Sequence, residues 1–428
     1  MKYIKISPLD GPAKATLAMP GSKSYTNRAL LLAAITAGPV KITNPLLSDD
    51  TKAMIACLQA LGIEIDVQQE YIEVKGDITS VTDQDYDLNA DLSGTTMRFM
   101  LALCAVLPGR QTLHGQKRLH ERPVGSLVEA LKQLGASIDY LGETDYPPLL
   151  VSPPKLTAVR LKISGQESSQ YLSALLMIAP LAGSLTIEVD GELVSKPYVD
   201  MTIEAMGQFG VKVNVDNEVY EVAGSQIYNC SEYVVEGDVS SASYFFAIAT
   251  LTGSTFTLEN INPSSLQADM SFLEILRNMG NGVTVGDDTI TIEGKALRPV
   301  SVDMKDCPDQ AQTLAVLAAF TDGVTTINGI KSLRIKETER VQALQQELSK
   351  MDIKTSSTPD ELTIQGGQPK AAVIDTYNDH RMAMAFAVAG TKLPGMVIQE
   401  PDVVSKTFPG FWEKLEAIGV DITRTEQL

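Results

Sequence analysis

Hydrophobic and polar residues follow two alternating periods along this chain, and their order repeats. A segment with apolar residues three or four apart ends in a large apolar residue and glycine, and a strand with every second residue apolar follows. A polar turn and a second alternating strand complete the unit. The fragment LQALGIEIDVQQEYIEVKG, which ends at Gly76, shows this order clearly. The pattern predicts a helix, a left-handed cap at the glycine and a β-hairpin.

The same unit occurs six times, with a marker residue where each helix ends. The marker residues lie roughly 70 residues apart, which is longer than a solenoid repeat and fits a small α/β module. They are Gly62, Gly135, Gly210, Gly280, Asp352 and Gly419. We therefore predict an α/β fold of six repeats. Because homologous modules orient their helices alike, helix starts from several modules can converge on one cleft.

Two short segments mark where the chain crosses between halves of the protein. Val235-Glu236-Gly237-Asp238-Val239 lies between the third and fourth repeats, and Met19-Pro20-Gly21 precedes the first long helix. We predict one discontinuous lobe from residues 1–20 and 239–428, and a second lobe from residues 21–238.

Composition excludes several classes of partner and site. The 428 residues carry 35 Lys and Arg against 53 Asp and Glu, and the net charge of -18 disfavours nucleic acid and anionic membranes. Neither a signal peptide nor an apolar run of spanning length is visible, so we predict a cytoplasmic protein, although a removed transit peptide leaves no trace. Four cysteines without a C-x-x-C pair indicate reduced thiols, and three histidines indicate no metal cluster.

Basic residues stand where seven helices are predicted to begin. A cation at the positive end of a helix dipole costs roughly 0.3–1 kcal/mol, and an anionic ligand removes that cost. The seven residues are Lys23, Arg98, Arg122, Lys196, Lys336, Arg381 and Lys406. They predict a substrate that carries phosphate and carboxylate groups.

Polar segments accompany these cations, and each has an ordinary structural explanation as well. Ser24 and Arg28 share a helix face and can hold one anion, Gly94 permits close approach of a ligand, and helix capping explains these segments about equally well. Lys336 and Arg340 are predicted to lie four apart on one helix, a like-charge pair that needs an anion or carboxylate between them.

Nine segments together resemble the enolpyruvyl transferase family, from Pro20 to Pro409. They are PGSKSYTNRALLLA, GTTMR, ERPVG, SSQYLSALL, LVSKPYVD, EGDVSSASYF, KETER, YNDHRMAMAF and SKTFPGF, in the family's order. The resemblance implies two lobes, each of three βαβαββ repeats in an inverted α/β-barrel-like fold. It also implies an active site in the cleft between the lobes, which close when ligands bind.

The implied reaction transfers the enolpyruvyl group of phosphoenolpyruvate to the 5-hydroxyl of shikimate 3-phosphate and releases phosphate, a step of aromatic amino acid biosynthesis. By resemblance, the residues that bind shikimate 3-phosphate are Lys23, Ser24, Arg28, Ser168, Ser169, Gln170, Ser195, Tyr198, Asp309, Ser332 and Lys336. Those that bind phosphoenolpyruvate are Lys23, Gly94, Arg122, Gln170, Arg340, Arg381 and Lys406. The resemblance implies no cofactor and no metal, and we expect a monomer with these two small molecules as its only ligands.

Two carboxyl groups take opposite roles in the implied mechanism. Asp309 matches the residue that accepts the proton of the attacking hydroxyl, and Glu337 matches the one that protonates the methylene carbon, with Lys23 as a possible partner. Both roles are chemically necessary, because the hydroxyl is a poor nucleophile and the enol carbon becomes electrophilic only when the methylene gains a proton.

The sequence departs from the family pattern at Leu92, Phe99 and Ser332, where many members have Asn, Pro and Asn. Leu92 cannot donate a side-chain hydrogen bond and Phe99 is expected to alter the packing behind Gly94, so these two changes bear on the response to inhibitors near phosphoenolpyruvate. A sister branch of the family acts on a UDP-linked amino sugar and carries a reactive cysteine ahead of its Arg-Pro segment. The corresponding stretch here, Gly115 to His120, has none. A catalytically silent anion-binding protein is the other alternative, and the presence of Asp309 and Glu337 disfavours it.

Overall fold

The computed structural model describes residues 2–153 and 159–427, which form six four-stranded sheets with one shared topology. In β10-β11-β13-β12, for example, the first two strands run parallel and the remaining pairs run antiparallel. The other five sheets repeat this pairing. The prediction of six α/β repeats is therefore confirmed.

The chain divides by contact into two compact units with three sheets each. Unit 1 comprises Met1–Pro20 and Glu236–Leu428, and unit 2 comprises Gly21–Val235.

Unit 2 contains the first three repeats. Its strands are β3 (Val40–Thr43), β4 (Ile65–Val67), β5 (Tyr71–Val74), β6 (Asp85–Asn89), β7 (Arg110–His114), β8 (Ser137–Tyr140), β9 (Leu149–Ser152), β10 (Arg160–Ser164), β11 (Leu185–Asp190), β12 (Asn214–Asp216), β13 (Val219–Val222) and β14 (Glu232–Val234). Its α-helices are α1 (Lys23–Ile35), α2 (Asp49–Ala60), α3 (Gly94–Cys104), α4 (Gly125–Leu134), α5 (Ser169–Ala182) and α6 (Pro197–Gln208), with 3-10 helices η1 (Ile78–Ser80) and η2 (Leu119–Glu121).

Unit 1 contains the last three repeats. Its strands are β1 (Tyr3–Ser7), β2 (Lys14–Ala18), β15 (Thr255–Glu259), β16 (Gly282–Val285), β17 (Thr289–Glu293), β18 (Ser301–Asp303), β19 (Val324–Asn328), β20 (Lys354–Ser357), β21 (Glu361–Gln365), β22 (Val373–Ile374), β23 (Met396–Gln399) and β24 (Asp421–Thr425). Its α-helices are α7 (Val239–Thr252), α8 (Phe272–Asn278), α9 (Ala311–Ala319), α10 (Arg340–Lys350), α11 (His380–Gly390) and α12 (Phe411–Ala417). Its 3-10 helices are η3 (Ala268–Ser271), η4 (Pro308–Gln310), η5 (Lys331–Ile335) and η6 (Pro401–Lys406).

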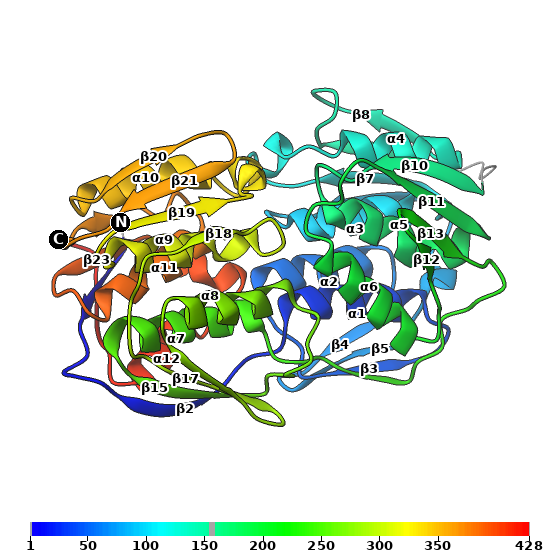
Figure 1. Ribbon diagram of the computed structural model, residues 1–428. Helices are drawn as coiled ribbons and strands as arrows, with labels where there is room; N and C mark the ends of the chain where they lie inside the picture. The colour runs from blue at the N-terminus through cyan, green and yellow to red at the C-terminus, as the bar shows by residue number, and fades with distance from the viewer. Residues whose placement is uncertain (1, 154–158, 428) are drawn as a thin grey trace. The chain divides into compact units, whose positions relative to one another are not determined.

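Distant segments complete three of the sheets. β14 is the parallel partner of β3, although almost two hundred residues separate them. Near the N-terminus, β1 lies between β23 and β24, and β2 pairs with β15 (Figure 1). These pairings join the N-terminal segment to unit 1 and the last strand of unit 2 to its first repeat.

All six marker residues adopt the left-handed conformation that the pattern predicted. Their φ angles run from 65° at Asp352 to 107° at Gly135. Glycine reaches this region without a steric penalty, and aspartate is among the few other residues that tolerate it. Asp352, the one marker residue that is not glycine, therefore forms the same left-handed turn as the five glycines.

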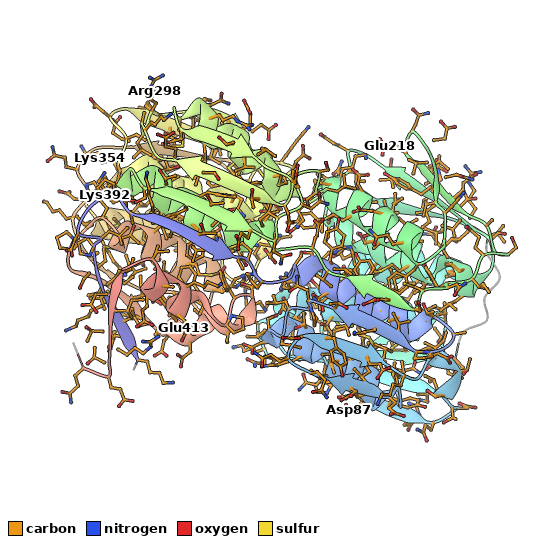
Figure 2. All side chains as sticks on the ribbon, turned by 90° about the horizontal axis from the view of Figure 1, so that it is seen from below. Asp87, Glu218, Arg298, Lys354, Lys392 and Glu413 are labelled. Atoms are coloured by element: carbon orange, nitrogen blue, oxygen red, sulfur yellow. The ribbon has the colours of Figure 1, made fainter. Side chains whose placement is uncertain are left out.

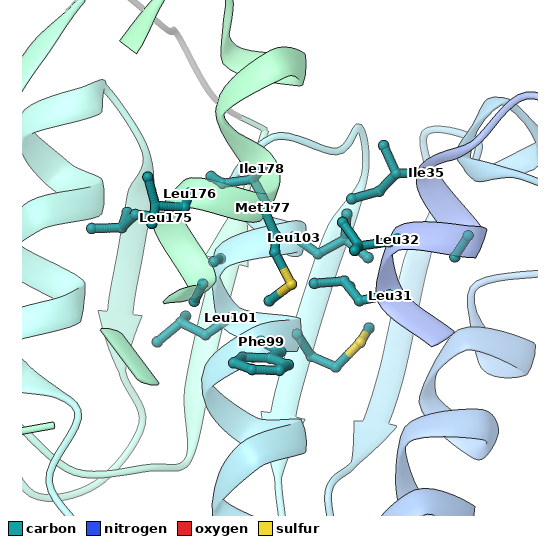
Figure 3. Packing of buried hydrophobic residues seen from close by; sticks show 14 of the residues in the cluster. Leu31, Leu32, Ile35, Phe99, Leu101, Leu103, Leu175, Leu176, Met177 and Ile178 are labelled. Carbon is teal, nitrogen blue, oxygen red and sulfur yellow. The ribbon is translucent and has the colours of Figure 1, made fainter. Parts of the chain in front are cut away.

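Three helices in each unit are buried along nearly their whole length. In unit 2 they are α1, α3 and α5, whose apolar side chains, Leu31, Phe99 and Met177 among them, pack together (Figure 3). Helices α7, α9 and α11 have the same role in unit 1. A helix that is apolar on all sides must lie inside a fold. Helices α5, α7 and α9 fit this rule directly, because they contain no charged residue. Charged side chains such as Asp87 and Glu218 lie on the outside (Figure 2).

Each of the two crossing segments accepts a hydrogen bond from an asparagine side chain of its own unit. Asn44 Nδ2 donates to Val235 O at 2.8 Å in unit 2, and Asn260 Nδ2 donates to Met19 O at 2.9 Å in unit 1. A glycine presses against each asparagine: a Cβ on Gly21 would overlap the carbonyl oxygen of Asn44, and a Cβ on Gly237 would overlap that of Asn260. Only glycine leaves room for the backbone at these points.

Gly237→Ala is expected to lower the free energy of unfolding by about 1–3 kcal/mol, because the added methyl group forces the backbone away from Asn260. Urea denaturation followed by circular dichroism measures this change. Gly11→Ala is the control, since a Cβ there meets no atom within 4 Å. Equal midpoints for the two variants would contradict the steric argument.

Candidate functional site

Several of the predicted site residues lie at or beside the N-termini of the buried helices, in each of the two units. In unit 2, Lys23 and Ser24 are the first residues of α1, Gly94 begins α3, and Ser169 and Gln170 begin α5. In unit 1, Asp309 lies in η4 directly before α9, and Arg381 is the second residue of α11. A buried helix start offers free backbone N–H groups in a setting of low dielectric constant, which favours anions.

Arg28 joins several of the unit 2 residues. Its Nη1 donates to Ser24 O at 3.0 Å, its Nη2 to Tyr198 O at 2.8 Å and its Nε to Thr202 Oγ1 at 2.7 Å. Only 2% of Arg28 is exposed, and burial lowers its pKa to about 10, so it remains a cation at neutral pH. Its guanidinium carbon lies 5.6 Å from the centre of the Phe99 ring. The departure from the family pattern at Phe99 therefore bears directly on Arg28.

Gly94 lies directly against Arg122. A Cβ on Gly94 would come within 2.7–2.8 Å of the guanidinium carbon and both terminal nitrogens of Arg122. The guanidinium can occupy this place only because residue 94 has no side chain. Close approach was the reason for predicting Gly94, and the group that approaches it here is a predicted ligand-binding side chain.

Gln170 is held by α3. Its Oε1 accepts from Arg98 Nη1 at 2.6 Å, and its Nε2 donates to Thr95 Oγ1 at 3.0 Å. Arg98 also lies over the ring of Tyr171, with its guanidinium carbon 5.5 Å from the ring centre. Arg98 thus orients Gln170, a role that the sequence did not reveal.

The serines of unit 2 have mixed surroundings. Ser168 is the N-cap of α5 and its hydroxyl accepts from Gln170 N at 3.3 Å, as the capping explanation predicted. Ser169 is buried. Ser195 adopts a left-handed φ of 52° just before α6 begins, an unfavourable conformation of the kind that clusters at functional sites.

Asp309 is the centre of the unit 1 group. Its Oδ1 accepts from Arg340 Nη1 at 2.9 Å and lies 3.5 Å from Lys336 Nζ, and its Oδ2 accepts from Arg381 Nη2 at 3.1 Å. Burial alone would raise the pKa of Asp309, but Arg381, together with Lys336 and Arg340, holds this pKa well below its usual range. The carboxylate is therefore ionised in the ligand-free protein.

Glu337 shares the guanidinium of Arg340 with Asp309. Its Oε2 accepts from Arg340 Nη2 at 2.9 Å, and its Oε1 lies 4.0 Å from Lys406 Nζ. Arg340 is 1% exposed, and although burial alone would lower its pKa, three carboxylates (those of Asp379, Glu337 and Asp309) raise it. The two predicted catalytic carboxyl groups therefore lie on one buried cation.

Several predicted helix starts are wrong. Arg98 is in the second turn of α3, Lys406 ends η6, and Arg122 lies three residues before α4. Lys196 does cap α6, but it pairs with Asp200 at 2.7 Å on the surface.

Lys336 and Arg340 do not share a helix face, because α10 begins only at Arg340. Both side chains instead form ion pairs with Asp309. Asp309 thus supplies the carboxylate that was predicted to lie between these two like charges. Ser332 lies in η5, four residues before Lys336.

The structure adds residues that sequence reasoning missed. Asp50 accepts from Lys23 Nζ at 3.1 Å, and Asp379 accepts from Arg340 Nε at 2.7 Å. Ser240 and Tyr244 both accept from Arg381. Asp379 had a signal, since it precedes a predicted helix in YNDHR, whereas Asp50 resembles any acidic residue in a first helical turn.

Three further predictions concern chemistry outside the clusters. All four cysteines have free thiols. Within residues 2–153 and 159–427, no group of three His, Cys, Asp or Glu side chains is arranged to hold a metal ion. In the same part of the chain, no helix has both the length and the apolar character needed to cross a bilayer.

Comparison with known proteins gives one consistent result. The family model described as EPSP synthase (3-phosphoshikimate 1-carboxyvinyltransferase) matches residues 9–415. The protein named 3-phosphoshikimate 1-carboxyvinyltransferase from Sulfurovum sp. (strain NBC37-1) is 43% identical over 407 residues, which cover 94% of this chain and 95% of that protein. The protein of the same name from Shewanella sediminis (strain HAW-EB3) is 41% identical over 425 residues, which cover 98% of this chain and 100% of that protein. The solved structure of EPSP synthase from Acinetobacter baumannii covers 100% of both chains with a TM-score of 0.82 at 22% identity, which shows that the fold is shared.

Proposed function

This chain belongs to the EPSP synthase family, and from that premise we propose how its buried cations and carboxylates carry out the family's reaction. The protein is an enzyme of the shikimate pathway. It transfers the enolpyruvyl group of phosphoenolpyruvate to the 5-hydroxyl of shikimate 3-phosphate and releases phosphate. The residue roles below are our proposal.

One observation carries the proposed mechanism: Asp309 and Glu337 lie on opposite terminal nitrogens of the same arginine, Arg340. The reaction needs one group to take the proton of the attacking hydroxyl and another to give a proton to the methylene carbon. We assign the first role to Asp309 and the second to Glu337, with Lys23 as a further proton carrier. When the tetrahedral intermediate breaks down, the methyl group returns a proton and the bond to phosphate breaks.

From the charge around Asp309 we infer that this carboxylate becomes basic only with substrates bound. In the ligand-free protein, Arg381, Lys336 and Arg340 favour its ionised form. Phosphate and carboxylate groups of the substrates bring competing negative charge to the same cations, so the affinity of Asp309 for a proton rises. Proton transfer is thereby coupled to the presence of both ligands.

We propose that the remaining residues bind the two substrates by charge and hydrogen bonding. For shikimate 3-phosphate they are Lys23, Ser24, Arg28, Ser168, Ser169, Gln170, Ser195, Tyr198, Asp309, Ser332 and Lys336. For phosphoenolpyruvate they are Lys23, Gly94, Arg122, Gln170, Arg340, Arg381 and Lys406. The contacts of Arg28 with Ser24 and Tyr198 support the first group, and the contact of Gly94 with Arg122 supports the second. We further propose that units 1 and 2 act as lobes that close on the ligands, in a cytoplasmic monomer.

Release of phosphate from shikimate 3-phosphate and phosphoenolpyruvate, without added metal, tests the acceptor and the cofactor requirement together. UDP-N-acetylglucosamine serves as the competing acceptor. Turnover with the amino-sugar nucleotide alone would reject the assignment. A radius of gyration that does not fall when both ligands are added would reject closure, and light scattering at several concentrations tests the monomer.

Gly94→Ala is expected to raise the KM for phosphoenolpyruvate by about 10- to 100-fold, since displacing a ligand-binding group by about 1 Å has effects of this size. The methyl group would push Arg122 out of its place, whereas the residues proposed for shikimate 3-phosphate stay in position. Steady-state kinetics in both substrates measures the difference. Gly207→Ala is the control, because a Cβ there meets no atom within 4 Å. An unchanged KM for phosphoenolpyruvate would reject the role of this contact.

A further inference from the structure

The loop before α11 holds two consecutive residues in the left-handed backbone conformation, which asparagine tolerates but tyrosine rarely adopts. Tyr377 has a φ of 52° and Asn378 a φ of 56°, in the left-handed region that side chains other than glycine rarely adopt. The next residue, Asp379, is the N-cap of α11, and Arg381 follows in its first turn. Such conformations persist only where surrounding contacts enforce them, and they cluster at functional sites. The contacts that enforce this one are therefore informative.

Glu347 supplies these contacts from the far end of α10. Its Oε1 accepts from Tyr377 OH at 2.6 Å, and its Oε2 accepts from Asp375 N at 3.0 Å. Lys350 Nζ donates to the same Oε2 at 2.7 Å. No part of Glu347 is exposed to solvent. A fully buried carboxylate needs several donors, and two of these three donors come from the strained loop.

Arg340, the first residue of α10, forms hydrogen bonds with the other end of the same loop. Its Nε donates to Asp379 Oδ2 at 2.7 Å and its Nη2 to Asp379 Oδ1 at 3.3 Å. Asp379 Oδ1 also accepts from Arg381 N at 2.8 Å. One helix thus fixes the segment from Asp375 to Asp379 at two points, and this segment sets the positions of both arginines.

We propose that Glu347 is a positioning residue for the reaction: by holding Tyr377 and Asp375, it fixes Asp379, which orients Arg340 and the backbone of Arg381 for phosphoenolpyruvate. This inference rests on the proposed roles of those two arginines. Glu347 touches neither Asp309 nor Glu337 through any hydrogen bond or ion pair found among the described residues. Its effect on catalysis is therefore transmitted through the loop.

The test uses the full-length enzyme with Glu347→Gln and Tyr377→Phe. Glutamine keeps the size of the side chain but replaces one acceptor oxygen by a donor, and phenylalanine removes one hydroxyl. We expect kcat/KM for phosphoenolpyruvate to fall about 10- to 100-fold in Glu347→Gln and less in Tyr377→Phe. The KM for shikimate 3-phosphate should change less than about threefold, because most of its proposed binding residues lie in unit 2. A general loss of folded protein would not separate the two substrates in this way.

Glu274→Gln is the matched control. Glu274 lies on a helix of the same unit and pairs with Arg277 at i+3, as Glu347 pairs with Lys350, but its side chain is exposed. Thermal unfolding is recorded for every variant. A double variant, Glu347→Gln with Asp379→Asn, should lose less activity than the product of the two single losses, since both residues act through the same loop.

Two different failures can be told apart with Arg340→Lys, which changes the arginine itself. If Arg340→Lys lowers kcat/KM for phosphoenolpyruvate but Glu347→Gln and Tyr377→Phe match the control, the positioning role is overturned and the proposed function stands. If Arg340→Lys has no effect on phosphoenolpyruvate, the role of Arg340 and the inference built on it both fall. A lower melting temperature with unchanged kinetics would make Glu347 a residue of stability only and would also overturn the proposal.

Discussion

Replacing Asp309 by asparagine or alanine is expected to reduce turnover by about 10²- to 10⁴-fold, the usual contribution of a positioned base. Asparagine can still accept a hydrogen bond from Arg340, but it cannot take the proton of the attacking hydroxyl. Removing the carboxylate also leaves Arg381 and Lys336 with less negative charge nearby, so anionic ligands should bind at least as tightly as before. Phosphate release measures turnover, and calorimetric titration with shikimate 3-phosphate measures binding.

Asp303→Asn is the control for Asp309, because its exposed carboxylate accepts a hydrogen bond from the backbone N–H of Lys305, away from the arginines around Asp309. Full activity in Asp309→Asn would remove Asp309 from the mechanism. Loss of both activity and ligand binding would instead indicate that Asp309 organises the cations and that another group takes the proton.

Glu337→Gln is expected to cause a loss of similar size, about 10²- to 10⁴-fold in kcat, for a different chemical reason. The amide preserves an acceptor for Arg340 Nη2 but cannot supply an acidic proton to the methylene carbon. In deuterated water, the methyl group of the intermediate takes up solvent hydrogen each time it forms. Both turnover and deuterium incorporation into phosphoenolpyruvate should therefore fall together, as nuclear magnetic resonance can show.

Glu361→Gln on β21 is the control for Glu337, since its nearest side-chain partner is the hydroxyl of Thr363. Incorporation of deuterium at the normal rate in Glu337→Gln, with turnover lost, would mean that another acid protonates the carbon. Lys23→Met then tests the remaining candidate.

Burial of the cations that we propose as binding residues reconciles the acidic composition with anionic substrates. The net charge of -18 belongs to the chain as a whole, whereas Arg28, Arg340 and Arg381 are each less than a tenth exposed. Charges in a setting of low dielectric constant act strongly over short distances, and the acidic surface is screened by salt. Local arrangement therefore outweighs the overall charge.

Local sequence patterns predicted the repeats well because their causes are local. Glycine or aspartate at each marker residue permits the left-handed turn that ends a helix, and all six turns occur. The motif KETER likewise identified Glu337 and Arg340, whereas Asp309 was identified only through the resemblance to a known family. The structure brings the three residues together. Helix starts were predicted less well: Arg98 and Lys406 failed because an apolar segment shows that a helix exists more clearly than where it begins.

The sequence by itself determined the number of modules, the turn that ends each helix and the residue types available for chemistry, because these depend on neighbours along the chain. Only the tertiary structure decided that β14 completes the sheet of β3, that Asp309 lies between Lys336 and Arg340, and that Glu347 holds the loop before α11. Such contacts join residues far apart in sequence, and the free energy that selects them comes from burying whole helices and sheets together, which no short pattern records.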